Sequence, residues 1–171
     1  MSIFGKWRRA KTDFAERDRL ATAIQRAIDE LVAEHAITRK FAEEPEDGDD
    51  QYNGFCARAV QVYWRLTREP KCRHLAADPD VEPYKLGKGA DAHYWIRAIN
   101  TGKVLDLNLG PHDSPDARYP YHLGERRLSF QPRTKGSNVP HNNDARLIME
   151  RVIRNECGDA EAKGPPGAGP D

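Results

Sequence analysis

Apolar residues recur at three- and four-residue spacing near the beginning of the chain. The apolar positions are Leu20, Ile24, Ala27, Ile28, Leu31 and Val32. Charged residues fill the opposite side of the same period, at Arg17, Asp18, Arg19, Arg26, Asp29 and Glu30. This pattern predicts an amphipathic helix that packs through one stripe, capped by Thr12 or Asp13 and ending at about Glu34.

A second helix is predicted from Gly54 to about Thr67, with Asn53 as its cap and Pro70 just beyond its end. Four residues of this segment share one helical face, namely Cys56, Val60, Tyr63 and Trp64. The thiol of Cys56 is therefore expected on the buried face, within the first turn of the helix.

A third helix is predicted near the end of the chain, from Asn142 or Asn143 to about Asn155. Its inward-facing residues are Leu147, Ile148, Met149 and Val152. Because these apolar positions again follow a helical period, this segment is expected to cover the same core.

Two strands are predicted at Ala92–Ile99 and Lys103–Leu109, joined at Asn100-Thr101-Gly102 as a hairpin. A further strand is predicted around Arg127–Gln131. The segment from Glu69 to Asp91 shows no period and is interpreted as an irregular crossover or a flap. Helices before and after a small antiparallel sheet indicate the α+β class.

The length of 171 residues fits one domain. We expect a flexible N-terminus at residues 1–10, a single domain at residues 11–157 and a disordered Gly- and Pro-containing tail at residues 158–171. No run of about 18 apolar residues occurs, so no membrane partner is expected.

The charges balance, with 27 Lys and Arg against 27 Asp and Glu. A balanced chain has no overall field that would attract nucleic acid. Locally the charges are uneven. Residues 41–50 include six acidic residues and no basic one, and residues 118–135 include five basic residues and one acidic residue. Solvated loops are the simpler interpretation of both segments; the alternative is that the basic segment meets an acidic partner or substrate.

Three widely separated cysteines, an odd number, do not suggest a disulfide framework. The first residues also lack a signal-peptide apolar core. The expectation is therefore free thiols in a reducing, cytoplasmic compartment.

Cys56, His93 and Asp106 follow one another along the chain as a helix-start thiol, an imidazole on one strand and a carboxylate on the next. A thiol is mostly protonated at neutral pH, and a helix N-terminus or a neighbouring imidazolium favours the thiolate. A base activates the nucleophile and a third group orients the base. The order predicts a cysteine-nucleophile hydrolase in which Asp106 orients His93.

Such a reaction needs donors for an oxyanion. The backbone amide of Cys56 is one candidate, and Gln51 or Asn53 could supply a side-chain donor. Gln51 is preferred because Asn53 is the predicted cap. Trp95 is a candidate for lining the substrate site, although aromatic side chains near a strand equally fill a core.

The predicted hairpin conflicts with this triad. A two-residue turn at Thr101-Gly102 pairs Asn100 with Lys103 and leaves His93 and Asp106 about four residues apart along the ladder, which is too far for a hydrogen bond. A bulge or a shorter effective hairpin would close the gap. With a regular ladder, another acceptor such as Asn108 would have to orient His93.

The residues around these positions resemble the YunG-like family of small bacterial proteins, and more distantly the papain-like superfamily with its transglutaminase-core and NlpC-type peptidases. The similar stretches are Asn53-Gly54-Phe55-Cys56-Ala57, His93-Tyr94-Trp95-Ile96-Arg97 and Gly102-Lys103-Val104-Leu105-Asp106-Leu107-Asn108. Two positions depart, with Asn108 where the family has Thr and Phe55 where Gln is common. The resemblance implies a papain-like fold in which the Cys56 helix packs on a sheet carrying His93 and Asp106.

Other functions stay open from the sequence. Cys72, His74, His112, His122 and His141 lack zinc-site spacing, so no metal or cofactor is expected. The substrate of an active enzyme would be a peptide, a protein or a small amide, split or transferred through a thioester. The alternatives are a non-catalytic binding module of the same fold and a purely structural thiol in an unrelated α+β domain. The oligomeric state is not encoded.

Overall fold

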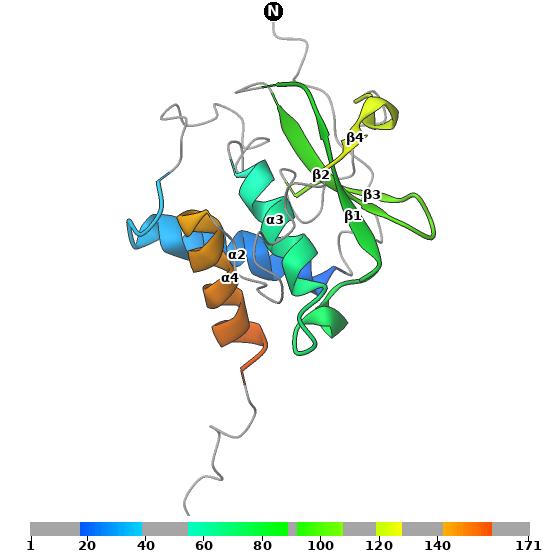
Figure 1. The fold of residues 1–171 in the computed structure, drawn as a ribbon. Helices are drawn as coiled ribbons and strands as arrows, with labels where there is room; N and C mark the ends of the chain where they lie inside the picture. Colours follow the sequence, from blue (N-terminus) through cyan, green and yellow to red (C-terminus); the bar gives the residue numbers. More distant parts are fainter. Residues whose placement is uncertain (1–17, 39–54, 89–91, 108–118, 128–141, 159–171) are drawn as a thin grey trace, which may run out of the picture.

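Three α-helices and a four-stranded antiparallel sheet form the described part of the chain (Figure 1). The computed structural model describes residues 18–38, 55–88, 92–107, 119–127 and 142–158. The helices are α2 (Arg19–Ala33), α3 (Cys56–Leu66) and α4 (Asn143–Glu156). The strands are β1 (Val81–Leu86), β2 (His93–Ala98), β3 (Val104–Leu105) and β4 (Glu125–Arg126), with short 3-10 turns η1 (Arg73–Leu75) and η3 (Tyr121–Leu123). The predicted α+β class is confirmed.

Helix α3 lies at the centre of this arrangement, between the sheet and the pair formed by α2 and α4 (Figure 1). It packs against β2 and β1 on one side and against both other helices on the other. This position explains why nearly the whole surface of α3 is buried, including Cys56, Val60, Tyr63 and Trp64, the face predicted from the sequence.

The start of α3 differs from the prediction. The helix begins at Cys56 rather than Gly54, and its N-cap is Phe55, which makes no side-chain cap hydrogen bond. Gly54 and the predicted cap Asn53 lie outside the described residues. The later start makes Cys56 the first residue of the helix.

The start of α2 also differs. Its N-cap is Asp18, whose Oδ1 accepts a hydrogen bond from the amide of Ala21 at 2.8 Å. The predicted caps Thr12 and Asp13 lie outside the described residues. Asp18 is fully buried rather than part of the charged face, because its Oδ2 accepts a hydrogen bond from the Tyr63 hydroxyl at 2.6 Å. The predicted apolar stripe and the end of the helix near Glu34 are confirmed.

Helix α4 matches its prediction closely. Asn142 is the cap, and its Oδ1 accepts from the amide of Ala145 at 3.1 Å. Ile148, Met149 and Val152 are buried, and Leu147 packs partly buried against the core. The cap and the apolar period together were sufficient to locate this helix.

Strand β1 was missed by the sequence interpretation, which left residues 69–91 without regular structure. Its central residue is Pro83, a residue that is disfavoured inside sheets because it lacks a backbone donor. In an antiparallel ladder the N–H and C=O of one residue point to the same neighbour. The Pro83 carbonyl accepts from Arg127 at 2.7 Å, so the missing donor faces β4, where the ladder is only two residues long.

Strand β4 also differs from the prediction of a strand at Arg127–Gln131. It occupies Glu125–Arg126 and pairs with Tyr84 and Lys85 of β1. Arg127 follows the strand, and residues 128–131 lie outside the described part. The strand order is β3-β2-β1-β4, so the hairpin predicted from Asn100-Thr101-Gly102 is present at one edge of the sheet.

The two faces of the sheet have different surroundings. Val81, Ile96 and Leu105 belong to the core cluster that the helices complete. Because side chains alternate along a strand, His93 and Trp95 lie on the opposite face from Ile96. Trp95 is fully buried but lies outside that core cluster, which indicates a second, aromatic cluster on this face.

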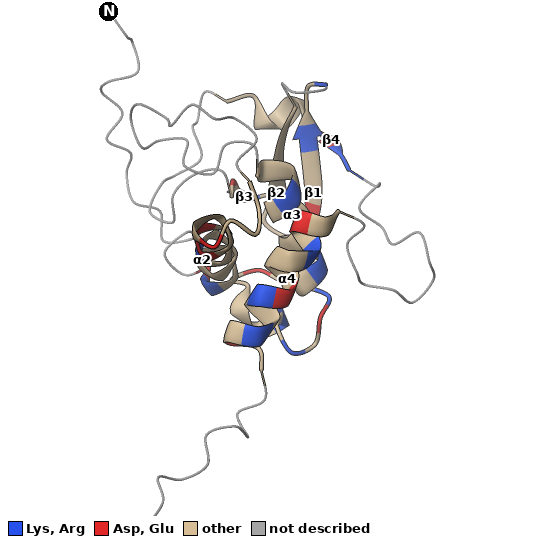
Figure 2. Cartoon of the chain, turned by 90° about the vertical axis from the view of Figure 1, so that its left-hand side faces the viewer, with Lys and Arg blue, Asp and Glu red and all other residues tan. Residues whose placement is uncertain are grey.

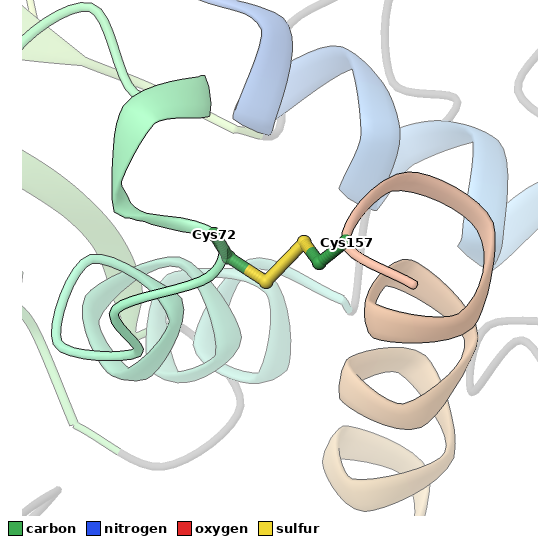
Figure 3. The surroundings of a disulfide bond; sticks show 2 residues. All are labelled: Cys72 and Cys157. Carbon is green, nitrogen blue, oxygen red and sulfur yellow. A yellow bond between two sulfur atoms is a disulfide. The ribbon is translucent and has the colours of Figure 1, made fainter. Parts of the chain in front are cut away.

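A disulfide bond joins Cys72, in the turn after α3, to Cys157 at the end of α4 (Figure 3). The Cα atoms lie 5.5 Å apart, within the ordinary range for a disulfide. The expectation of free thiols was therefore wrong for these two residues, because the fold brings together positions separated by 85 residues. Disulfides persist mainly in oxidising compartments, so the cysteines no longer argue for a reducing one.

Charged residues of both signs lie side by side on α4 (Figure 2). Arg151 lies 2.9 Å from Glu30 of α2, and Arg26 lies 2.9 Å from Glu156 of α4. These ion pairs join the two helices. The acidic segment 41–50 lies outside the described residues, as do residue 118 and residues 128–135 of the basic segment.

None of the described helices has the length and apolarity needed to cross a membrane. The flexible terminus predicted at residues 1–10 and the tail predicted after Gly158 lie outside the described residues.

Candidate active site

Cys56 occupies the N-terminus of α3 and retains about 9% of its surface exposed. All three cysteines of the chain are described, and Cys56 is the free one. The first-turn amides of a helix have no acceptor within the helix, and the helix dipole places partial positive charge there. The first turn of α3 contains no acidic residue. Negative charge on this sulfur is thus favoured by its position.

His93 is the first residue of β2, and its side chain is 20% exposed. The ring Nε2 lies 2.6 Å from Asp106 Oδ2, and the ring also hydrogen-bonds Cys56. Because Asp106 occupies Nε2, Nδ1 is the ring nitrogen left for the sulfur. The imidazole therefore connects the thiol to the carboxylate.

The charge state of His93 follows from these contacts. Burial alone would lower the pKa of His93, but the hydrogen bonds to Asp106 and Cys56, together with their charges, outweigh burial and raise the pKa to about 10. An imidazole with this pKa carries its proton at neutral pH. In the resting site the ring beside Asp106 is therefore an imidazolium rather than a free base.

The turn between β2 and β3 removes the geometric conflict that the sequence raised. The expected two-residue turn would pair Asn100 with Lys103, but Lys103 instead pairs with Ala98, whose amide donates to the Lys103 carbonyl at 2.9 Å. The turn therefore spans residues 99–102 and shifts the pairing by two positions. Gly102 adopts φ +68°, a left-handed conformation that side chains disfavour.

This shift places Asp106 beside His93. The ladder pairs Ile96 with Leu105. Continued by one residue, it sets Asp106 opposite Trp95, which lies on the same face as His93. Diagonal neighbours on one face of an antiparallel pair are close enough for side chains to meet. The carboxylate therefore reaches the imidazole through a longer turn, and not through the bulge or the shorter hairpin that the sequence analysis considered.

Asp106 is nearly inaccessible, with 3% of its side chain exposed. Its Oδ2 accepts a second hydrogen bond, from the hydroxyl of Tyr121 at 2.7 Å. Sequence analysis missed Tyr121 because it lies in η3, whose contact with Asp106 depends on tertiary structure and has no fixed spacing. The paired Tyr119-Pro120-Tyr121 sequence before a glycine was the only local signal of an aromatic turn.

Aromatic rings surround the imidazole. Tyr119 meets the His93 ring edge-on with centroids 5.1 Å apart, and Trp95 lies 5.9 Å from it. Tyr121 packs edge-on against Trp95 at 5.2 Å. Burial and the charges of Asp106 and Cys56 raise the pKa of Tyr119, which places its ring close to both groups. The rings limit water around the charged groups and thereby strengthen their interaction.

The predicted oxyanion and substrate residues are only partly accounted for. Gln51 and Asn53 lie outside the described residues. Trp95 is fully buried, so it packs against the His93 ring and presents no surface to solvent. Phe55, which stands where the similar family has Gln, is fully buried and carries no donor. Among the described candidates, the amide of Cys56 is the donor next to the sulfur.

Within the described residues, no three His, Cys, Asp or Glu side chains gather in a way that could hold a metal ion. Of the candidate ligands, Cys72 is bonded to Cys157. His112 and His141 lie outside the described residues.

No protein-family model, curated protein or solved structure matches this chain. The resemblance to YunG-like and papain-like proteins accordingly depends on the residues quoted above.

In the geometry of this site, one imidazole connects a free thiol to a buried carboxylate. Such a set can stabilise a thiolate, transfer a proton from the ring and hold the ring in one orientation. The sequence prediction that Cys56, His93 and Asp106 meet in space agrees with these contacts. What they do to a substrate is a separate inference.

Proposed function

We propose that this protein is a cysteine-nucleophile hydrolase or acyltransferase of papain-like architecture that acts on an amide or thioester bond. The observation that carries the proposal is the continuous hydrogen-bonded series Cys56, His93, Asp106. The three residues come from the start of α3, the start of β2 and the end of the β2–β3 hairpin. Separate elements that converge on one imidazole are typical of a built catalytic site.

In the first half of the reaction the Cys56 thiolate attacks the substrate carbonyl carbon, and a C–S bond forms. The carbonyl π electrons move to oxygen, where the Cys56 amide can stabilise the negative charge. When the tetrahedral intermediate collapses, the C–N bond breaks and the His93 imidazolium gives its proton to the leaving amine. An acyl thioester on Cys56 and a neutral imidazole remain.

In the second half, neutral His93 removes a proton from water or from an acceptor amine that attacks the thioester. The C–S bond breaks, and the thiolate and imidazolium are restored. Water yields hydrolysis, and an amine yields acyl transfer. Because His93 is protonated at rest, it acts first as an acid and then as a base, the reverse of the order expected from the sequence alone.

A peptide, a protein or a small amide fits this reaction class, and no cofactor is required by it. The balanced charge of the chain gives no reason to invoke nucleic acid.

The small exposed fraction of Cys56 favours one competing function, a non-catalytic binding module that keeps the same fold. In that case the three side chains would stabilise the junction between α3 and the sheet. The two functions differ in whether a reagent can reach an ionised sulfur.

Alkylation of Cys56 by iodoacetamide tests the proposal. An ordinary thiol is about 1% ionised at pH 6.5. A thiolate paired with imidazolium should therefore react at pH 6.5 at least about tenfold faster than the same cysteine in urea-unfolded chain. His93→Ala should remove this advantage, because it removes the counter-charge.

The intact Cys72–Cys157 disulfide protects the other two thiols, so labelling can be assigned to one site. Cys56→Ser serves as the control and should incorporate no label. A folded wild-type protein that reacts no faster than unfolded chain, with no effect of His93→Ala, would favour the binding module.

A further inference from the structure

Two donors meet on a single oxygen of the buried carboxylate. The His93 Nε2 lies 2.6 Å and the Tyr121 hydroxyl 2.7 Å from Asp106 Oδ2. A carboxylate oxygen that already accepts one proton donor holds a second one less strongly, because both draw on the same negative charge. The strength of the Asp106–His93 contact therefore depends on a residue outside the triad.

The Tyr121 ring is held firmly enough for this contact to be a fixed feature of the site. It packs against Trp95 and lies 4.7 Å from the ring of Tyr119. The turn closes through a hydrogen bond from the Gly124 amide to the Tyr121 carbonyl at 3.2 Å. The neighbouring rings and this backbone hydrogen bond thus fix the direction from which the Tyr121 hydroxyl approaches Asp106.

Gly124 shows how closely this turn is fitted to the sheet. A Cβ atom at Gly124 would lie 2.1 Å from one atom of the Trp95 ring and 2.3 Å from another. Only glycine therefore allows the turn to lie directly on Trp95. After it, β4 pairs with β1 and fixes the other end of the segment.

We propose that Tyr121 is a positioning residue of this site, whose hydroxyl shares Asp106 Oδ2 with the Nε2–H group of His93 and so limits how strongly the carboxylate stabilises the imidazolium. This inference rests on the proposed function for its chemical purpose. An imidazolium that is bound too strongly by its carboxylate is a poor acid towards a leaving amine. By taking part of the charge on Oδ2, Tyr121 keeps the Nδ1 proton of His93, on the side of Cys56, acidic enough to be transferred.

The groups that face His93 come from three directions. Cys56 approaches from α3, Asp106 from the end of the hairpin, and Tyr119 and Tyr121 from the segment before β4. Among them, Tyr121 is the neutral donor on the oxygen that His93 uses. Its effect on His93 can therefore be measured by changing one hydroxyl.

The test is an NMR titration of His93 in the full-length protein labelled with ¹³C,¹⁵N-histidine, with His93→Gln used to assign the signal. Tyr121→Phe should raise the pKa of His93 by about half a unit or more, a roughly threefold gain in proton affinity, because one donor that competes with the ring for Oδ2 is removed. Tyr119→Phe is the matched control. It removes a hydroxyl from the adjacent ring and should move the titration by less than about 0.2 units.

A second variant gives the opposite sign. Incorporating 3-fluorotyrosine at position 121 makes the phenol a stronger donor, so the pKa of His93 should fall. It keeps the ring and the hydrogen bond, and it decides the question if circular dichroism shows that Tyr121→Phe is unfolded. An unchanged or lowered pKa in folded Tyr121→Phe, or a raised one with fluorotyrosine, would overturn the proposal.

The titration needs neither a substrate nor a reactive thiol. Slow alkylation of Cys56 together with the expected shifts would reject the hydrolase and keep the role of Tyr121 in holding the pair. Fast alkylation with unmoved titrations would support the hydrolase and reject the role of Tyr121.

Discussion

The described structure contains two hydrogen-bonded tyrosine–aspartate pairs in different surroundings. In the helical interior, the Tyr63 hydroxyl donates to Asp18 Oδ2 at 2.6 Å. On the opposite side of the sheet, the Tyr121 hydroxyl donates to Asp106 Oδ2 at 2.7 Å. Both carboxylates are almost completely buried. A buried carboxylate with a phenol partner is therefore not in itself a sign of function.

The remaining donors distinguish the two pairs. Asp18 accepts from the backbone amides of Ala21 and Ala77, which cannot give up their protons. Asp106 accepts from His93, which can. The first pair fixes the start of α2 to α3 and to the chain after η1. In the proposed mechanism, the second pair borders the ring that transfers a proton. The third partner decides whether this arrangement is a structural joint or a chemical site.

Exchanging each carboxylate for its amide should separate the two roles most strongly. Asp106→Asn removes the charge beside His93, so the pKa of His93 should fall and turnover should drop by up to about 10⁴-fold. Asp18→Asn should leave the titration of His93 in place and cost about 1–3 kcal/mol of unfolding free energy, because one buried donor loses its acceptor. NMR titration and urea unfolding of both variants measure the two effects.

One outcome would contradict the distinction between the Asp18 pair and the Asp106 pair. Suppose that Asp106→Asn mainly destabilised the fold, and that the titration of His93 and the alkylation rate of Cys56 were unchanged. Both tyrosine–aspartate pairs would then have only a structural role.

Like the Asp18–Tyr63 pair, the Cys72–Cys157 disulfide should affect the free energy of unfolding and not the titration of His93. Cys72 and Cys157 close a long loop, separated by 85 residues. In the chain-entropy model a loop of this length contributes about 4–5 kcal/mol to the free energy of unfolding. The double substitution Cys72→Ser and Cys157→Ser should lower the urea midpoint accordingly.

Neither cysteine of the bond contacts His93 in the described network, so the His93 titration should be the same in the double variant when measured below its unfolding transition. The wild-type protein treated with a reductant is the matched comparison. A shift in the His93 titration would show that the disulfide and the site are coupled.

The sequence was informative where a local rule operates. Asn142 as a cap and the period of Ile148 and Val152 located α4 almost to the residue. The same rules failed at β1, because Pro83 breaks the usual strand composition while its missing donor faces the short strand β4. Asp18 was placed on a charged face because the sequence cannot show that Tyr63 lies opposite it.

The candidate site shows the same difference between local signals and tertiary contacts. The types and order of Cys56, His93 and Asp106 could be recognised from the sequence, but their contact could not, since it depends on a turn two residues longer than the one expected. Tyr121 and the Cys72–Cys157 bond were missed because both are contacts between elements distant in sequence. Residue chemistry was readable locally, whereas register and tertiary pairing were not.

The pH dependence of stability gives the most specific contrast between the two pairs. The pKa of His93 in the folded chain is about 10, above its ordinary 6.5. Its contribution to stability is therefore fully present below pH 6.5 and is lost as the pH rises through about 10. Burial raises the pKa of Asp18 above 3.8 despite the hydrogen bond from Tyr63, so its contribution is present below pH 3.8 and is lost as the pH rises through the folded-state value.

The two groups therefore act in separate pH windows, and each can be read against its own variant. The difference in unfolding free energy between wild type and His93→Gln should shrink between pH 6 and pH 10, while the difference between wild type and Asp18→Asn should change only in the acid range. Urea unfolding at a series of pH values measures both. A wild-type advantage over His93→Gln that stayed constant to pH 10 would mean that His93 is uncharged in the folded protein, and the imidazolium on which the proton transfer depends would be absent.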